Sequence, residues 1–121
     1  MIRSGTIDLP IARKENSIIE RCIDKNGDKS ITHYKVLNEK EFKNIKYSVV
    51  KCILETGRTH QIRVHMSAIS HPLLGDDLYG GNTTLIDRQA LHSYKVSFIH
   101  PLTNKNVNYI ADLPEDINKL I

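Results

Sequence analysis

In the stretch ITHYKVL, residues 31–37, the side chains alternate between two faces with a period of two, so that every second residue falls on the same face. This period is typical of a β-strand. The stretch IKYSVVKCIL, residues 45–54, is rich in β-branched and aromatic residues, which predicts a second and longer strand. Residues 38–44 between the two stretches are charged and polar, and we expect them to form a surface loop.

The sequence before residue 31 predicts a third strand. Residues 18–23 form a short apolar stretch, and the dipeptide Asn26-Gly27 follows it, which is the strongest short-range signal for a β-hairpin. Residues 1–16, interrupted by a glycine and a proline, predict a connector. We therefore expect an antiparallel meander in which the strand at 18–23 pairs with the strand at 31–37.

A helical pattern replaces the strand pattern after residue 55. The hydroxyl of Thr59 is suited to cap the first turn of a helix. The residue before Pro72 avoids helical dihedral angles, so we expect the helix to span residues 60–70. Its apolar residues recur at helical spacing and predict one buried stripe, formed by Ile62, Met66 and Ile69.

The rest of the chain predicts short elements. We expect a turn region at residues 75–82, one helical turn at 87–92, strands at 93–99 and 107–111, and a terminal helix at 114–121. Antiparallel strands with a few short helices define the α+β class. The chain has 121 residues, an ordinary size for one domain, so we expect a single domain over residues 1–121.

Charge is unevenly distributed along the chain. The 17 Lys and Arg against 14 Asp and Glu give a net charge of +3. Counted along the same sequence, residues 1–75 carry 13 basic and 8 acidic side chains, and residues 76–121 carry 4 and 6. A basic first part permits a nucleic-acid partner. Solvated surface charge explains the same distribution equally well.

Membrane and secreted proteins are not favoured by this sequence. It has no apolar stretch near the roughly 20 residues that a membrane helix needs, and its first residues lack the layout of a signal peptide. Cys22 and Cys52 lie in strand-like stretches, outside any CxxC motif. We expect both to be buried, reduced thiols, which suits a cytoplasmic location.

The densest group of polar side chains is ETGRTHQIRVH, residues 55–65, at the expected start of the helix. A helix N-terminus favours a phosphate or carboxylate, and an arginine there can hold a carboxylate through two parallel hydrogen bonds. The alternative is structural: Arg58 and Arg63 pair with Glu55 or Asp76 and brace the loop.

Two other groups of polar residues could form sites. His60 and His65 are five residues apart, whereas helical zinc ligands are four apart, so we expect no metal. Asp76 and Asp77 are neighbouring carboxylates that could perform acid–base chemistry. Their place after Gly75 favours instead a turn cap or an arginine partner.

The string TGRTHQIRVH at residues 56–65, followed by HPLLGD at 71–76, resembles the RluA-type pseudouridine synthases. Further similar strings are THYKVL at 32–37 and RQALH at 88–92. This resemblance implies isomerisation of uridine to pseudouridine in ribosomal or transfer RNA. The uracil–ribose bond breaks, the base turns, and a carbon–carbon bond forms, with the target uridine flipped out of its stack. The resemblance also implies that no metal or organic cofactor is needed.

The family's nucleophilic aspartate belongs to an HRLD-type motif, and no His-Arg-Leu-Asp string occurs in this sequence. We therefore expect residues 1–121 to be the C-terminal portion of a pseudouridine synthase catalytic domain, inactive by itself. Arg63 is similar to the family arginine that pairs with the nucleophile, and a guanidinium favours the ionised form of a neighbouring carboxylate. The resemblance makes Arg58, His60 and Gln61 candidates for supporting the loop or contacting the RNA backbone.

Two other interpretations remain open at this point. The basic first part and the missing motif also fit a non-catalytic RNA-binding module. The chain could equally be one half of a split synthase, completed by a separate chain that carries the HRLD-type motif. In either incomplete form we expect open strand edges, and therefore association with the missing half or with a second copy.

Overall fold

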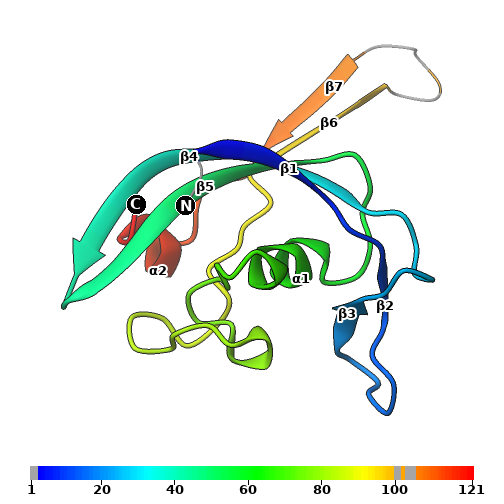
Figure 1. Cartoon of the computed structure of the whole chain (residues 1–121). Helices are drawn as coiled ribbons and strands as arrows, with labels where there is room; N and C mark the ends of the chain where they lie inside the picture. The colour runs from blue at the N-terminus through cyan, green and yellow to red at the C-terminus, as the bar shows by residue number, and fades with distance from the viewer. Residues whose placement is uncertain (1–2, 100–101, 103–105) are drawn as a thin grey trace. The chain divides into compact units, whose positions relative to one another are not determined.

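The computed structural model describes residues 3–99, 102 and 106–121 (Figure 1). The chain folds into two compact units, residues 1–89 and 90–121. Each unit contains antiparallel strands and short helices, which confirms the expected α+β class.

The first unit is built on strands β4 (Ile31–Phe42) and β5 (Ile45–Leu54), which pair antiparallel. Lys43 and Asn44 connect the two strands. Their φ angles of 51° and 65° are those that a tight hairpin turn requires. The loop expected at residues 38–44 is therefore wrong, because most of it is strand. The polar residues there are paired across the ribbon, with Glu41 opposite Lys46, and opposite charges stabilise such a pair.

The N-terminal residues also form strands, so the expected connector is wrong. Strand β1 (Ser4–Asp8) pairs with β4 and completes a sheet of order β1-β4-β5. Strand β2 (Ile11–Arg13) pairs with β3 (Arg21–Ile23). The expected meander is therefore wrong at its first strand, since β3 pairs with β2 and not with β4, whereas the pairing of the next two strands, β4 and β5, is confirmed.

The turn at Gly27 explains that difference. Ile11 exchanges two backbone hydrogen bonds with Asp28, at 2.9 and 2.8 Å, so residues 24–28 fold back onto β2. A Cβ atom at Gly27 would lie 2.6 Å from the Ile11 backbone. The Asn-Gly dipeptide therefore serves a close backbone contact, and it does not connect two paired strands.

Helix α1 (Gln61–Ala68) lies beneath the sheet and contacts β4 and β3 (Figure 1). Thr59 does not cap it, because the helix begins after His60, whose φ is 56°, and has no side-chain cap. The expected apolar stripe is also wrong in part. The buried positions of the helix are Gln61, Val64, His65 and Met66.

Polar side chains bind α1 to the sheet. The Gln61 amide donates to the backbone oxygen of Ile31 and to Thr32 Oγ1, each at 3.0 Å. Its oxygen accepts from the Thr56 hydroxyl at 2.8 Å and the Arg58 backbone N–H at 3.0 Å. All four hydrogen-bonding positions of this buried amide are therefore used.

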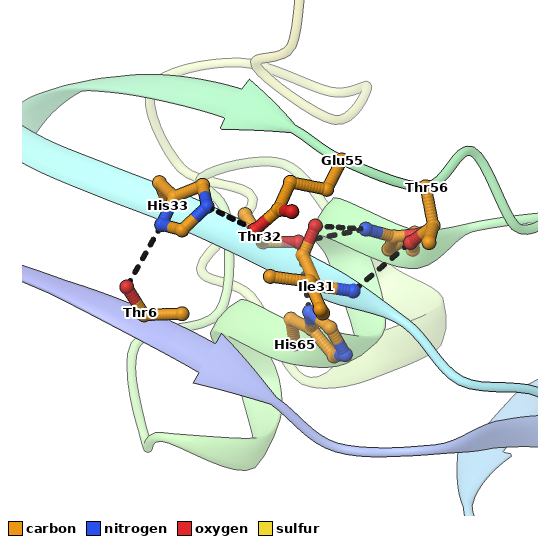
Figure 2. Close-up of polar contacts among 8 residues, drawn as sticks. Thr6, Ile31, Thr32, His33, Glu55, Thr56 and His65 are labelled. Carbon is orange, nitrogen blue, oxygen red and sulfur yellow. Dashed lines mark hydrogen bonds and ion pairs between the residues drawn. The ribbon is translucent and has the colours of Figure 1, made fainter.

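His65 continues this network and is fully buried. Its Nδ1 lies 2.8 Å from Thr32 Oγ1 and its Nε2 lies 2.9 Å from the backbone oxygen of Leu9. Because a carbonyl only accepts, Nε2 carries the proton, and the Thr32 hydroxyl donates to Nδ1. Figure 2 shows His65 and His33 on opposite sides of β4, with His33 bonded to Thr6 and Glu55.

Apolar side chains complete the core of the first unit. The buried ones come from β1, β2, β4, α1 and the loop before residue 89, namely Ile7, Ile11, Val36, Val64, Met66 and Ile86. Cys22 and Cys52 are free thiols, as expected, but they are half-buried. Burial raises the pKa of the Cys52 thiol to about 11, so this thiol is protonated at neutral pH.

The second unit contains β6 (Lys95–Ile99) paired with β7 (Asn106–Ile110), and helix α2 (Glu115–Asn118). These elements confirm the expected strands and terminal helix with shifted ends. Residues 87–92 form no helical turn; a short 3-10 helix, η1 (Asp77–Tyr79), lies earlier in the chain. Within the described part of the chain, no helix is long and apolar enough to span a bilayer.

The buried hydroxyl of Thr32 provides a test of this polar core. Thr32→Val keeps the side-chain shape but leaves His65 Nδ1 and one Gln61 N–H without their partner. We expect the free energy of unfolding in urea to fall by about 1–3 kcal/mol. Thr6→Val, which removes an exposed hydroxyl bonded to His33, should change it by no more than about 0.5 kcal/mol. Equal effects of the two substitutions would contradict this assignment.

Candidate active site

Arg63 and Asp76 form the centre of the candidate site. Arg63 Nε donates to Asp76 Oδ2 at 3.0 Å, and Nη2 donates to Oδ1 at 2.9 Å. The Asp76 side chain is fully buried, and that of Arg63 is 14% exposed. The hydrogen bond with Asp76 raises the pKa of Arg63, although burial opposes this. The two side chains therefore form an ion pair with two parallel hydrogen bonds, which we call the clamp. The third guanidinium nitrogen, Nη1, makes no hydrogen bond to Asp76.

Two glycines allow the loop at residues 71–81 to place Asp76. Gly75 has a φ of 76°, and a Cβ atom there would lie 1.9 Å from the Arg88 backbone oxygen. A Cβ atom at Gly81 would lie 1.9 Å from the Leu73 oxygen. Backbone hydrogen bonds from Gly75 to Asn82 at 2.8 Å and from Gly81 to Asp76 at 2.7 Å close the loop. The loop therefore has no room for larger residues at these positions.

Tyr79 connects three parts of the site. The guanidinium carbon of Arg63 lies 5.1 Å from the centroid of the Tyr79 ring, a cation–π contact. The Tyr79 hydroxyl accepts from the backbone N–H of Arg21 at 2.9 Å and lies 2.8 Å from His60 Nδ1. The His60 and Tyr79 rings meet edge to face, with centroids 5.7 Å apart. One side chain thus joins β3, the start of α1 and Arg63.

His60 faces this site as a neutral imidazole. Burial lowers its pKa, and the charges of Arg63 and Arg21 lower it further, while Asp76 acts in the opposite direction. Because the Tyr79 hydroxyl already accepts from Arg21, its own proton can go to His60 Nδ1. This arrangement leaves His60 Nε2 as an N–H donor.

The other residues expected at this site have structural partners. Arg58 donates from Nε to the Lys29 backbone oxygen at 3.0 Å and does not pair with Glu55 or Asp76. Gln61 is buried in the network below the sheet. The bracing alternative is therefore correct for Arg63, which pairs with Asp76, and wrong for Arg58, which pairs with neither of the two carboxylates. Asp77 is exposed, so the two neighbouring carboxylates do not act together.

Tyr79 and Arg21 are the residues that sequence reasoning missed. Tyr79 closely follows the HPLLGD string at residues 71–76, but its position there predicts no contact. Arg21 lies 58 residues from Tyr79, and no local pattern predicts so distant a hydrogen bond. The His60 side chain bonds to Tyr79 on η1, whereas the His65 side chain bonds to Thr32 on β4.

Asp76→Asn tests the clamp. The substitution leaves the largely buried guanidinium of Arg63 without its countercharge. We expect the free energy of unfolding to fall by about 3 kcal/mol or more. Asp77→Asn is the matched control, because it removes a neighbouring but exposed carboxylate, and should stay within about 0.5 kcal/mol of the parent. A small effect of Asp76→Asn in urea unfolding would show that the pair is not maintained.

The titration of His60 tests the proximity of the two arginines. We expect the NMR titration midpoint of the His60 imidazole to lie below its ordinary value of 6.5, because burial and both arginines disfavour the imidazolium. The arginine contribution should fall in Arg21→Gln, and the midpoint should rise. A midpoint at or above 6.5 in the parent chain, or one unmoved by the substitution, would contradict this description.

Comparison with known proteins identifies the family to which this chain is similar. The family model described as RNA pseudouridylate synthase matches residues 1–68. The chain is 54% identical over 117 residues to the uncharacterized RNA pseudouridine synthase YjbO of Bacillus subtilis, covering 97% of this chain and 40% of that protein. It is 43% identical over 136 residues to ribosomal large subunit pseudouridine synthase D of Buchnera aphidicola, covering 100% and 42%.

A solved structure agrees with these relatives. Human RNA pseudouridylate synthase domain containing 1 superposes with a TM-score of 0.78 at 30% identity, covering 93% of this chain and 49% of that one. The chain spans about two fifths of the length of the two bacterial relatives. By the matched residues and by the shared fold, the chain belongs to the RluA-type pseudouridine synthases of the RNA pseudouridylate synthase family.

Proposed function

We propose that this chain supplies the arginine side of an active site that isomerises uridine to pseudouridine in RNA. Residues 1–121 are then the C-terminal portion of the catalytic domain. The nucleophilic aspartate comes from a segment that carries an HRLD-type motif, a string that these 121 residues do not contain. The observation that carries the proposal is the Arg63 guanidinium, held by Asp76 at two nitrogens and by Tyr79 on its face.

The remaining nitrogen of Arg63, Nη1, is the proposed contact of the nucleophilic aspartate. Within the described residues, no hydrogen bond reaches Arg63 Nη1. An aspartate placed there stays ionised, because a neighbouring guanidinium favours the charged carboxylate. An ionised carboxylate can act as the nucleophile that the reaction requires. The reaction breaks the bond from ribose to N1 of uracil and forms one to C5, while N1 gains a proton and C5 loses one.

The substrate side of the proposal rests on the family and on charge. One relative is named for the large ribosomal subunit, which supports ribosomal RNA as the substrate. A ribosomal RNA substrate and the two free thiols both favour a cytoplasmic location for this protein. Within the site, we assign RNA contact to His60, while Arg58 and Gln61 hold the loop that carries it. No metal or organic cofactor is part of the proposed reaction.

The sheet offers a route to the missing segment. Its order, β1-β4-β5, leaves β1 and β5 at its edges. An edge strand presents unpaired backbone groups to another chain or segment. We propose that the HRLD-bearing segment pairs there, or that a second copy of this chain does so when the segment is absent.

Complementation tests the function. The chain is mixed with a separately made synthase segment that carries an HRLD-type motif, and release of tritium from C5-labelled uridine in ribosomal RNA is measured. We expect no release by either part alone and clear release by the mixture. Arg63→Ala should lower the rate about 100- to 1,000-fold, as for loss of a positioned charge. Arg63→Lys should restore little, because lysine lacks the planar fork.

Arg3→Ala is the control for this assay, because Arg3 is exposed and its nearest carboxylate, that of Glu39, is 3.7 Å away. Its rate should match that of the parent mixture. Release of tritium by the chain alone would overturn the proposed division of the active site. A mixture that associates and binds RNA without any release would favour the non-catalytic RNA-binding module.

A further inference from the structure

We propose that Thr6, His33 and Glu55 form a second active site, at which the Thr6 hydroxyl takes the acyl group of a small carboxylic ester and passes it to water. The three side chains lie on the face of the β1-β4-β5 sheet that is turned away from α1 (Figure 2). The inference is independent of the proposed function, because it uses no residue assigned to uridine isomerisation or to RNA contact.

The hydrogen bonds place His33 as a base between a hydroxyl and a carboxylate. His33 Nε2 lies 2.5 Å from Glu55 Oε2, and its Nδ1 lies 2.8 Å from Thr6 Oγ1. A carboxylate only accepts, so Nε2 of the neutral imidazole carries the proton, and Nδ1 accepts from the Thr6 hydroxyl. A hydroxyl bonded to a base that a third group orients is the arrangement that activates serine and threonine as nucleophiles.

Strand register brings these side chains together. The Val36 N–H donates to the Arg3 oxygen at 2.7 Å, so these two residues form a hydrogen-bonded pair of the β1–β4 ladder. The two kinds of pair alternate along the ladder, so Thr6 and His33, three positions away, form a non-hydrogen-bonded pair, in which side chains are closest. Glu55 donates its backbone N–H to β4 two residues before His33, which places its carboxylate beside the imidazole.

Two positively polarised groups are available to the oxyanion that forms when a hydroxyl attacks an ester. In a non-hydrogen-bonded pair the backbone N–H of Thr6 points away from β4, toward the open edge of β1. Lys35 lies diagonally across from Thr6 on the same face, at a separation that a long side chain spans. Among the described residues, no carboxylate forms an ion pair with Lys35. An N–H and an ammonium group so placed stabilise a tetrahedral intermediate.

The surroundings favour a small, uncharged ester. The side chains of His33 and Glu55 are 40% and 54% exposed, so an ester can reach the hydroxyl from solvent. Ile53 lies directly opposite His33 on β5, is 56% exposed, and offers an apolar contact to the acyl group. Asp8 lies on the same face of β1 as Thr6, and its negative charge disfavours an anionic substrate.

The reaction has two balanced steps. Thr6 Oγ1 forms a bond to the carbonyl carbon while its proton goes to His33 Nδ1, and the alcohol of the ester leaves with that proton. Water then attacks the acyl group on Thr6 and gives a proton to Nδ1, and Thr6 Oγ1 regains this proton as the carboxylic acid leaves. The net reaction is hydrolysis of an ester. Glu55 does not touch the ester and is a positioning residue, which holds the imidazole in one tautomer.

Hydrolysis of p-nitrophenyl acetate tests this inference on the 121-residue chain itself. We expect the chain to release more nitrophenolate than its own molar amount, at a rate above that of free imidazole at equal concentration. Thr6→Val removes the nucleophile and should lower kcat/KM about 100-fold. Thr6→Ser keeps a hydroxyl and should retain the activity. Mass spectrometry of the acid-quenched parent should map an acetyl group to Thr6.

Variants of the two partner residues separate this chemistry from general imidazole reactivity. His33→Gln should lower the rate as far as Thr6→Val does. Glu55→Gln should lower kcat more than it changes KM, and Glu55→Asp should restore part of kcat, because a carboxylate again orients the imidazole. His71→Gln is the matched control, because it removes another exposed imidazole, and its rate should equal that of the parent. Urea unfolding checks that each variant is folded.

The opposing outcomes are distinct. Hydrolysis by Thr6→Val at the parent rate, or a parent rate no higher than that of free imidazole, would overturn the inference. Equal losses in His33→Gln and His71→Gln would overturn it too, because they would show that any exposed imidazole reacts with the ester. In each of these cases the synthase proposal stands, since it depends on Arg63 and is decided by the complementation assay.

Discussion

The two hydrogen bonds between Arg63 and Asp76 constrain the whole region around the candidate site. A fully buried carboxylate is stable only with a charged partner whose donors fit its two oxygens, and the guanidinium fork provides them. The glycines at 75 and 81 allow the loop to bring Asp76 close enough. Tyr79, carried by the same loop, then covers the face of the guanidinium.

Helix α1 is held by polar side chains on two faces. Toward the sheet, Gln61 and His65 bond to β4 and to the Leu9 backbone. Toward the loop, Arg63 and Ser67 bond to Asp76 and to the Tyr79 backbone. Polar contacts are directional, whereas apolar contacts tolerate sliding, so this helix has a defined rotation relative to the sheet. That rotation directs Arg63 toward Asp76 and Tyr79.

The sequence predicted the elements whose pattern is local. The alternation at residues 31–37 and the β-rich stretch at 45–54 indicate strands, and the structure contains both. Strand β1 escaped prediction because it is short and its partner is distant; Thr6 and His33 are 27 residues apart. Strand β2 escaped it because it has only three residues. Thr59 failed as a cap because the helix begins after a left-handed His60.

Part of the candidate site was also predictable, because its sequence signal is local. Arg63 stood out through its motif, and its pairing with Asp76 was one of the alternatives that the sequence left open. The buried polar face of α1 was not predictable, because Gln61 and His65 are usually found outside a core. Hydrogen-bonding partners from β4, from residue 9 and from residues 56 and 58 make their burial favourable.

Asp76 and Tyr79 hold the Arg63 guanidinium in place within the chain itself, without a further segment or ligand. The guanidinium NMR signals of the isolated chain test this most directly, with exposed Arg13 as internal reference. We predict separate, slowly exchanging Nε and Nη signals for Arg63, which reflect hindered rotation, and averaged signals for Arg13. Averaged signals for Arg63 would show that Asp76 and Tyr79 do not hold its guanidinium, and would contradict a preformed clamp.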